Sequence, residues 1–198
     1  VADATIDGFG RVGSMFASNM YDFEPDMLVC AKGMTSAYAP IGALMVAEKL
    51  FEPFKHGTAL FPHGYTYGGH PVSCAVALEN LDIFDEEDLV GNVARNQAAF
   101  KASLDSLRDL PIVGDVRGIG YFWAIELVKD KTTKETFNDS ESEKLLRGIL
   151  SQKMFEEGLY CRSDDRGDPV VQLAPPLTIG PDEFDEMTAI LRGALEHA

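Results

Sequence analysis

The feature that most constrains the fold is a short apolar run that ends at a lysine. Residues 27–31 are all apolar, and Lys32 and Gly33 follow directly. Such a continuous run is typical of a strand that is buried on both faces, as in a parallel sheet covered by helices. A lysine rarely lies at the end of a core strand without a partner or a function. The run therefore predicts a parallel α/β layer with an amine at one strand end.

Two interpretations of Lys32 follow from the residues alone. Burial at the strand end would favour the neutral amine, which is the nucleophilic form that Schiff-base chemistry needs. The alternative is a side chain that follows the apolar surface and keeps its ammonium group in water. Both interpretations fit the local sequence.

The opening segment carries a second charged group in an apolar context. Residues 1–6 read as a short strand with Asp3 at its centre. A buried carboxylate is costly unless a cation accompanies it. The partner could be a lysine or arginine in a structural ion pair, or the protonated nitrogen of a bound heterocycle.

Three glycines follow that strand with the spacing of a dinucleotide-binding turn. Gly8, Gly10 and Gly13 match the fingerprint that seats a pyrophosphate on a helix N-terminus. The second strand of such a fold should end near a carboxylate that binds the ribose, whereas this one ends at Lys32. A Rossmann oxidoreductase is therefore kept only as an alternative.

Two further features suit the binding of anions. Residues 65–71, which include Thr66, form a loop of small and hydroxylic residues that leads into a helix start, a typical phosphate environment. The alternative is a plain loop before a helix that begins at Pro71. Arg162 follows the apolar residues 159–161 and could bind a carboxylate through two hydrogen bonds. Its alternative is a solvent-exposed salt bridge with a nearby aspartate.

The hydrophobic pattern divides the chain into two parts with different predicted architectures. The first half reads as part of a parallel α/β layer, and the second as a small α+β domain. Strands or strand-like apolar segments are predicted at 41–46, 112–116, 121–128, 159–162 and 170–174, and helices at 14–21, 48–54, 71–84, 89–107, 142–157 and 181–196. Within the helix at 89–107, the residues Val93, Phe100, Leu104 and Leu107 recur near a helical period and predict its core face.

Charge and cysteine content exclude several classes of partner. The chain has 17 lysines and arginines against 32 aspartates and glutamates, a formal net charge of −15. Nucleic acid and anionic membrane surfaces are disfavoured, because both require clustered positive charge. No apolar run is long enough for a membrane-spanning helix. Cys30, Cys74 and Cys161 lack the spacing of a metal site, so we expect free thiols in a reducing cytoplasm and no bound metal.

The ordered motifs together resemble the C-terminal half of a class III pyridoxal-phosphate-dependent aminotransferase, most of all the ω-amino acid–pyruvate transaminase branch. The resemblance covers essentially the whole chain, with motifs at 3–11, 25–26, 31–43, 63–71, 114–118 and 174–177. It implies an α/β fold, the C-terminal part of a fold type I pyridoxal-phosphate-dependent transferase. Residues 1–86 would be the C-terminal part of the large, mostly parallel-sheet, cofactor-binding domain. Residues 87–198 would be a linking helix and a small α+β C-terminal domain, and the natural chain would continue upstream of Val1.

The resemblance also implies the roles of individual residues. Lys32 would form a Schiff base with pyridoxal 5'-phosphate, and Asp3 would pair with the protonated ring nitrogen. Thr66 would bind the cofactor phosphate of the neighbouring subunit in a homodimer, and Arg162 would hold a substrate carboxylate. Two positions depart from the family pattern, which commonly has an acidic and then a small apolar residue after the aspartate, because Ala4 and Thr5 stand there.

The reaction that this resemblance implies is amino transfer from an amine or amino acid donor to a keto acid acceptor. Two alternatives remain open: a different pyridoxal-phosphate enzyme of the same fold, such as an aminomutase or decarboxylase, and a non-catalytic remnant of the fold. These 198 residues alone are expected to be inactive, because the family's N-terminal half supplies most of the phosphate site.

Overall fold

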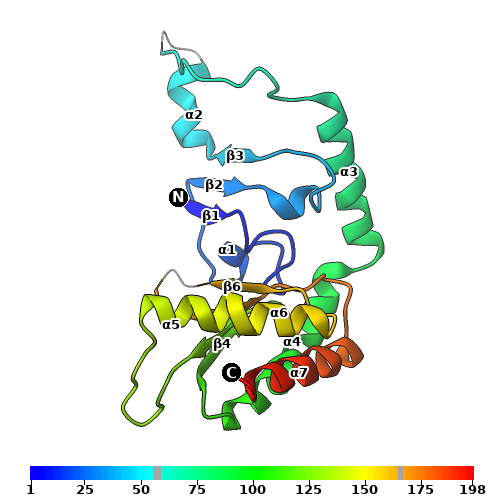
Figure 1. The fold of residues 1–198 in the computed structure, drawn as a ribbon. Helices are drawn as coiled ribbons and strands as arrows, with labels where there is room; N and C mark the ends of the chain where they lie inside the picture. The colour runs from blue at the N-terminus through cyan, green and yellow to red at the C-terminus, as the bar shows by residue number, and fades with distance from the viewer. Residues whose placement is uncertain (56–58, 165–166) are drawn as a thin grey trace. The chain divides into compact units, whose positions relative to one another are not determined.

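The computed structural model describes residues 1–55, 59–164 and 167–198 (Figure 1). The described chain forms two compact units, Val1–Gly91 and Asn92–Ala198, and each is considered by itself. The division falls inside helix α4 (Leu89–Asp105). The sequence had placed the boundary after residue 86, and the domain identities assigned on either side of it stay predictions. No helix in the described part of the chain is both long and apolar enough to cross a membrane.

The first unit is built on a three-stranded sheet (Figure 1). Strand β1 (Ala2–Ala4) pairs in parallel with β2 (Met27–Cys30), and β2 pairs antiparallel with β3 (Ala43–Val46). The expectation that the run at 27–31 is buried on both faces is wrong for this structure. Leu28 and Cys30 are buried, whereas the side chains that alternate with them are only partly covered. The part of the sheet formed by β1 and β2 therefore has one packed face and one open face, whereas Leu44, Met45 and Val46 of β3 are all exposed.

The glycine-rich turn follows β1, and its residues Gly8, Phe9 and Gly10 are buried. A side chain at Gly8 would place its Cβ 2.6 Å from the carbonyl oxygen of Ala4, and Gly10 and Gly13 have left-handed φ values of 84° and 82°. The helix that follows, α1 (Ala17–Met20), is a single turn that starts beyond the glycines. A dinucleotide site needs a helix N-terminus directly at the turn, so the Rossmann alternative is wrong.

Helices α2 (Glu48–Lys55) and α3 (Pro71–Glu86) complete the first unit, together with the 3₁₀ turn η1 (Lys32–Met34). Helix α3 begins with a proline at its first position, as the sequence predicted. Its buried face was not predicted: it consists of Ser73, Ala77, Asn80 and Phe84. By contrast, the apolar Val72 and Leu78 are 63% and 65% exposed.

The second unit contains an antiparallel sheet in the order β4-β5-β7-β6. Its strands are β4 (Val113–Ile119), β5 (Phe122–Leu127), β6 (Arg162–Asp164) and β7 (Val170–Leu173). The strand predicted at 159–162 begins only at Arg162. The amide of Leu159 instead donates to the carbonyl of Met154 and finishes the preceding helix, after Gly158 turns the chain with a φ of 94°.

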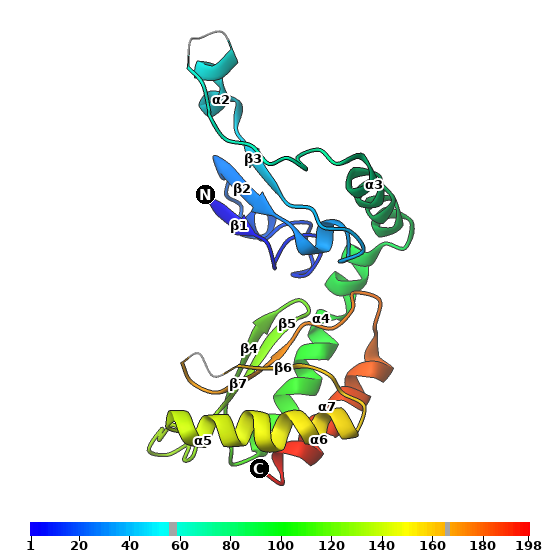
Figure 2. The same cartoon turned by 45° about the horizontal axis from the view of Figure 1, so that its top comes forward.

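Helices pack against this sheet and enclose the core of the second unit (Figure 2). They are α4, the 3₁₀ turn η2 (Ser106–Asp109), the continuous run of α5 (Asp139–Glu143), η3 (Lys144–Leu150) and α6 (Ser151–Glu156), and α7 (Pro181–Leu195). The core face predicted for the helix at 89–107 is confirmed, since Val93, Phe100 and Leu104 of α4 and Leu107 of η2 are all 0% exposed. The Phe100 ring stacks on Phe184 of α7, with 4.7 Å between ring centroids. The mixed α/β character predicted for the chain is confirmed.

Candidate functional site

Lys32 is the second residue after β2 and opens the turn η1. Its φ is 45°, a left-handed conformation that costs roughly 1–2 kcal/mol for a residue with a side chain. Two backbone hydrogen bonds form the turn, from Met34 N to Ala31 O at 3.1 Å and from Thr35 N to Lys32 O at 3.2 Å. The Lys32 side chain is exposed, so the burial that the sequence suggested for it is wrong for this structure. Strained backbone of this kind persists only where surrounding contacts hold it.

Asp3 lies on the strand next to β2, and its side chain is also exposed, contrary to the expected buried carboxylate. The register pairs it with Val29, so both project from the open face of the sheet. Hydrogen bonds from the hydroxyl and the amide of Thr5 lower the pKa of Asp3, and the positive charge of Lys32 adds to this effect. The amide N of Thr5 lies 3.0 Å from Oδ1. Asp3 is therefore an ionised carboxylate whose charge is fixed by its neighbours.

The open face joins these two charged groups with apolar surface. Val29 pairs with Asp3 on one side and with Leu44 of β3 on the other, and Leu44 is 53% exposed. A carboxylate, a nearby primary amine and exposed apolar side chains thus share one part of the first unit. This is the donor set for a flat, partly apolar molecule that carries a cationic nitrogen and an electrophilic carbon.

Thr66 lies in the loop that leads into α3, and it is exposed. A turn follows, with Gly68 N donating to Tyr65 O at 3.0 Å and Gly69 at a left-handed φ of 68°. The residue that precedes the helix, His70, gives no side-chain cap to its first amides. Those amides and the Thr66 hydroxyl are therefore groups that could bind a phosphate, as the sequence suggested. The structure does not bring Thr66 into hydrogen-bonding contact with Asp3 or Lys32.

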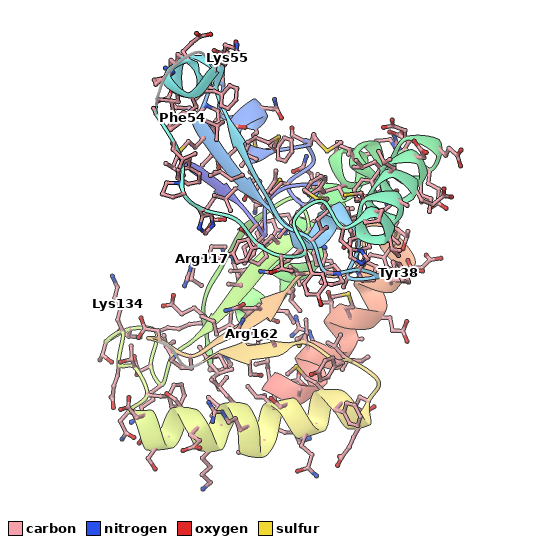
Figure 3. The ribbon with its side chains drawn as sticks, turned by 90° about the horizontal axis from the view of Figure 1, so that it is seen from above. Tyr38, Phe54, Lys55, Arg117, Lys134 and Arg162 are labelled. Atoms are coloured by element: carbon pink, nitrogen blue, oxygen red, sulfur yellow. The ribbon has the colours of Figure 1, made fainter. Side chains whose placement is uncertain are left out.

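Arg162 is the first residue of β6 in the second unit (Figure 3). It pairs in register with Gln172 of β7, and its side chain is exposed. The polar segment that follows it, residues 163–169, includes positions 165–166, which lie outside the described residues. The predicted role of Arg162 toward a carboxylate stays a prediction, because it belongs to a different unit from Lys32.

Sequence analysis missed two residues that hold the Lys32 turn. Asn80 of α3 donates from Nδ2 to Gly33 O at 2.9 Å and to Met34 O at 3.2 Å. Thr35, only 2% exposed, donates from its hydroxyl to Ala39 O at 2.7 Å. The available signal for Asn80 was its helical spacing from Ala77 and Phe84, which places a polar amide on a buried face.

The chemistry of this donor set fits part of a pyridoxal phosphate cofactor. An ionised carboxylate such as Asp3 suits a protonated ring nitrogen, and the exposed amine of Lys32 suits an aldehyde. The uncapped start of α3 suits the phosphate. No cluster of three or more potential metal ligands occurs in the described ranges.

Comparison with known proteins covers almost the whole chain and not only the candidate site. The family described as aminotransferase class-III matches residues 1–195. A probable aminotransferase of Mycobacterium tuberculosis is 58% identical over 195 residues, which cover 98% of this chain and 42% of that protein. A putrescine–pyruvate aminotransferase of Pseudomonas aeruginosa is 40% identical over 197 residues, 99% of this chain and 41% of that protein.

Solved structures agree with the sequence comparison. An (S)-enantioselective omega-transaminase from Thermomicrobium roseum superposes with a TM-score of 0.90 at 39% identity, covering 98% of this chain and 42% of that one. A transaminase from the marine bacterium Virgibacillus gives a TM-score of 0.91 at 36% identity, covering 99% and 44%. The chain thus spans less than half the length of the relatives it matches. The extent of the family match identifies this chain as a member of the class III aminotransferases, in the C-terminal part of their fold.

Proposed function

We propose that the protein containing this chain is a pyridoxal-phosphate-dependent aminotransferase that moves an amino group from an amine or amino acid to a keto acid. The observation that carries the proposal is that Asp3 lies on β1 and that Lys32 follows the parallel neighbour β2, near enough for its positive charge to contribute to the lowered pKa of Asp3. Membership of the class III family, whose members depend on pyridoxal phosphate, supports the same cofactor here.

When bound, pyridoxal phosphate supplies an aldehyde that condenses with a primary amine, with loss of water, and a protonated ring that withdraws electrons. Lys32 Nζ would be the point of covalent attachment. Once the incoming amine has displaced it, the same Nζ would act as a general base and accept the proton from the carbon that bears the amino group. It would then act as a general acid and donate that proton to a second atom of the bound reactants. Asp3 would keep the ring nitrogen protonated. This carboxylate is exposed and its pKa is lowered, so it is ionised near neutral pH.

The remaining predicted residues complete the proposal. Thr66, with the first amides of α3, would bind the cofactor phosphate of the partner subunit in a homodimer, which the uncapped helix start supports. Arg162 would hold the carboxylate of the keto acid through two parallel hydrogen bonds. The named substrates of the Pseudomonas relative, putrescine and pyruvate, support an amine donor and a keto acid acceptor. A cytoplasmic location is also proposed, in keeping with three free cysteines.

The test is cofactor attachment in the full-length protein. Mixing pyridoxal phosphate with the apoprotein should shift the visible absorbance spectrum of the free cofactor, and borohydride should fix the cofactor to the peptide that contains Lys32. Lys32→Ala should abolish the fixed adduct and the transaminase activity. Lys49→Ala is the matched control, because Lys49 is an exposed lysine of the same unit that pairs with Asp26. A cofactor spectrum that stays that of free pyridoxal phosphate after mixing, or an adduct that survives Lys32→Ala, would refute the proposal.

A further inference from the structure

We propose that Asn80 is a positioning residue for Lys32: its side-chain amide holds the η1 turn in the conformation that presents the Lys32 amine to the cofactor. This inference rests on the function proposed for Lys32. Asn80 itself touches neither the lysine side chain nor any group assigned to the cofactor, so it would act only through the turn.

The hydrogen-bonding capacity of Asn80 matches the turn in number and kind. Its NH₂ group has two donors, and two carbonyl oxygens receive them, those of Gly33 at 2.9 Å and Met34 at 3.2 Å. Because carbonyls only accept, the amide must face them with its nitrogen. Asn80 is 7% exposed, so water does not readily replace it as the donor to these oxygens.

The turn is a segment that needs such support. Lys32 adopts a left-handed φ of 45°, which a lysine does not favour by itself. The residues of the turn lie 46 and 47 positions before Asn80 in sequence, so the amide ties the strained segment to the long helix α3. Loss of this tie should let Lys32 relax toward ordinary backbone angles and carry its amine away from the open face of the sheet.

A purely structural role is the competing explanation, and the chain contains a control for it. Asn92 of α4 makes the same pair of contacts in the second unit, from Nδ2 to Leu177 O at 2.7 Å and to Ile179 O at 3.1 Å. Both asparagines tie a helix to two backbone carbonyls distant in sequence. Replacing either should cost stability, but only Asn80 contacts the Lys32 turn.

The experiment compares Asn80→Leu with Asn92→Leu in the full-length protein, because leucine keeps the branching of asparagine at Cγ, removes its hydrogen-bonding groups and is the more favourable residue in a helix. Thermal stability is recorded for both variants. The first specific measurement is the rate at which pyridoxal phosphate becomes attached to the apoprotein. The second is the pH dependence of Lys32 acylation by an amine-reactive ester in the cofactor-free protein, read by peptide mass spectrometry.

Asn80→Leu should slow attachment about tenfold, which corresponds to about 1.4 kcal/mol, the net value of one to two hydrogen bonds. It should also alter the pH profile of Lys32 acylation, whereas Asn92→Leu should change neither. Equal effects of the two variants on attachment and acylation would overturn the positioning role. If Asn80→Leu does not fold, Asn80→Ser and Asn92→Ser are compared in the same way, with the same outcomes.

Failure of the proposed function is distinguishable from failure of this inference. If the wild-type protein forms no adduct at Lys32, the assignment of the cofactor fails. The acylation profile of Lys32 does not require the cofactor, so a profile that responds to Asn80→Leu but not to Asn92→Leu still supports the positioning role. A profile that responds to neither variant overturns it.

Discussion

Replacing Gly33 with alanine would insert a methyl group into the contact between the Lys32 turn and the segment beneath it. An added Cβ would lie 2.9 Å from Phe9 Cβ and 3.4 Å from two atoms of the Phe9 ring. Gly33 does not have a left-handed backbone, so the penalty is steric and not conformational. Phe9 cannot absorb the contact by rotating its ring, because the closest atom is its Cβ.

The size of the effect follows from this geometry. Ordinary contacts of a Cβ start at 3.4 Å, so the turn and Phe9 must separate by about half an ångström. Overpacking of a closely packed site typically costs about 1–3 kcal/mol. Because Phe9 is 6% exposed and its ring packs against Phe16 at a centroid distance of 5.4 Å, the displacement is opposed from both sides.

Native-state hydrogen exchange gives a local measurement of this cost in the full-length protein. The amides of Met34 and Thr35 are hydrogen-bonded within the turn, and their protection should fall by a factor of about five to one hundred and fifty in Gly33→Ala. Gly42→Ala is the control. An added Cβ there has its nearest atoms at 3.5 and 3.6 Å, so protection of the turn should not change.

A double-mutant cycle identifies the cause. Phe9 has a left-handed φ of 56°, which glycine tolerates, so Phe9→Gly removes the opposing Cβ without adding backbone strain. In that background Gly33→Ala should lose most of its effect on the turn. An effect of equal size with and without the Phe9 side chain would refute the steric explanation.

Three further predictions concern the second unit. Arg162→Ala should raise the KM for a keto acid far more than that for a simple aldehyde, and equal changes would remove its proposed role. Burial raises the pKa of the Cys161 thiol to about 11, so its alkylation in the native protein should keep rising up to about pH 11, and a plateau near pH 9 would contradict this. Hydrogen bonds from Arg108 and Lys101 lower the pKa of Asp105 below 3.8, so its ion pairing stabilises the fold above that pH and is lost as the pH falls. Arg108→Met should therefore lower the urea midpoint more at pH 7 than at pH 3, and equal losses at both values would exclude this contribution.

The two long helices show how far a hydrophobic pattern predicts burial. In α4 the predicted core residues are fully buried, because their partners on the sheet and on α7 belong to this same chain. In α3 the buried face was not predicted: the apolar Leu78 is exposed and the polar Asn80 is buried. Periodicity finds the apolar side of a helix, but which side becomes covered depends on neighbours that the local sequence does not contain.

The same distinction applies to the candidate site, where some features could be predicted from the sequence and others could not. Lys32 and Asp3 could be found from the sequence because charged residues are unusual in short apolar strands. Their exposure could not, since it depends on what covers the open face of the sheet. Asn80 was missed because its partners are backbone carbonyls. Every residue has such a carbonyl, so no pattern of side chains indicates which two an amide will meet.

The charge state of Asp3 shows that a site residue can be prepared by local structure instead of by burial. The strand leaves Asp3 exposed, yet its pKa is lowered, chiefly by hydrogen bonds from the hydroxyl and amide of Thr5. Thr5 stands where the resemblance to the family implies a small apolar residue, and its hydroxyl contributes a hydrogen bond that such a residue lacks. The departure that removes an apolar contact thus also strengthens the ionised form of the carboxylate. An exposed carboxylate is already ionised near neutral pH, and these hydrogen bonds extend that state to more acidic pH, so Asp3 carries the negative charge that its proposed role toward a cationic ring requires.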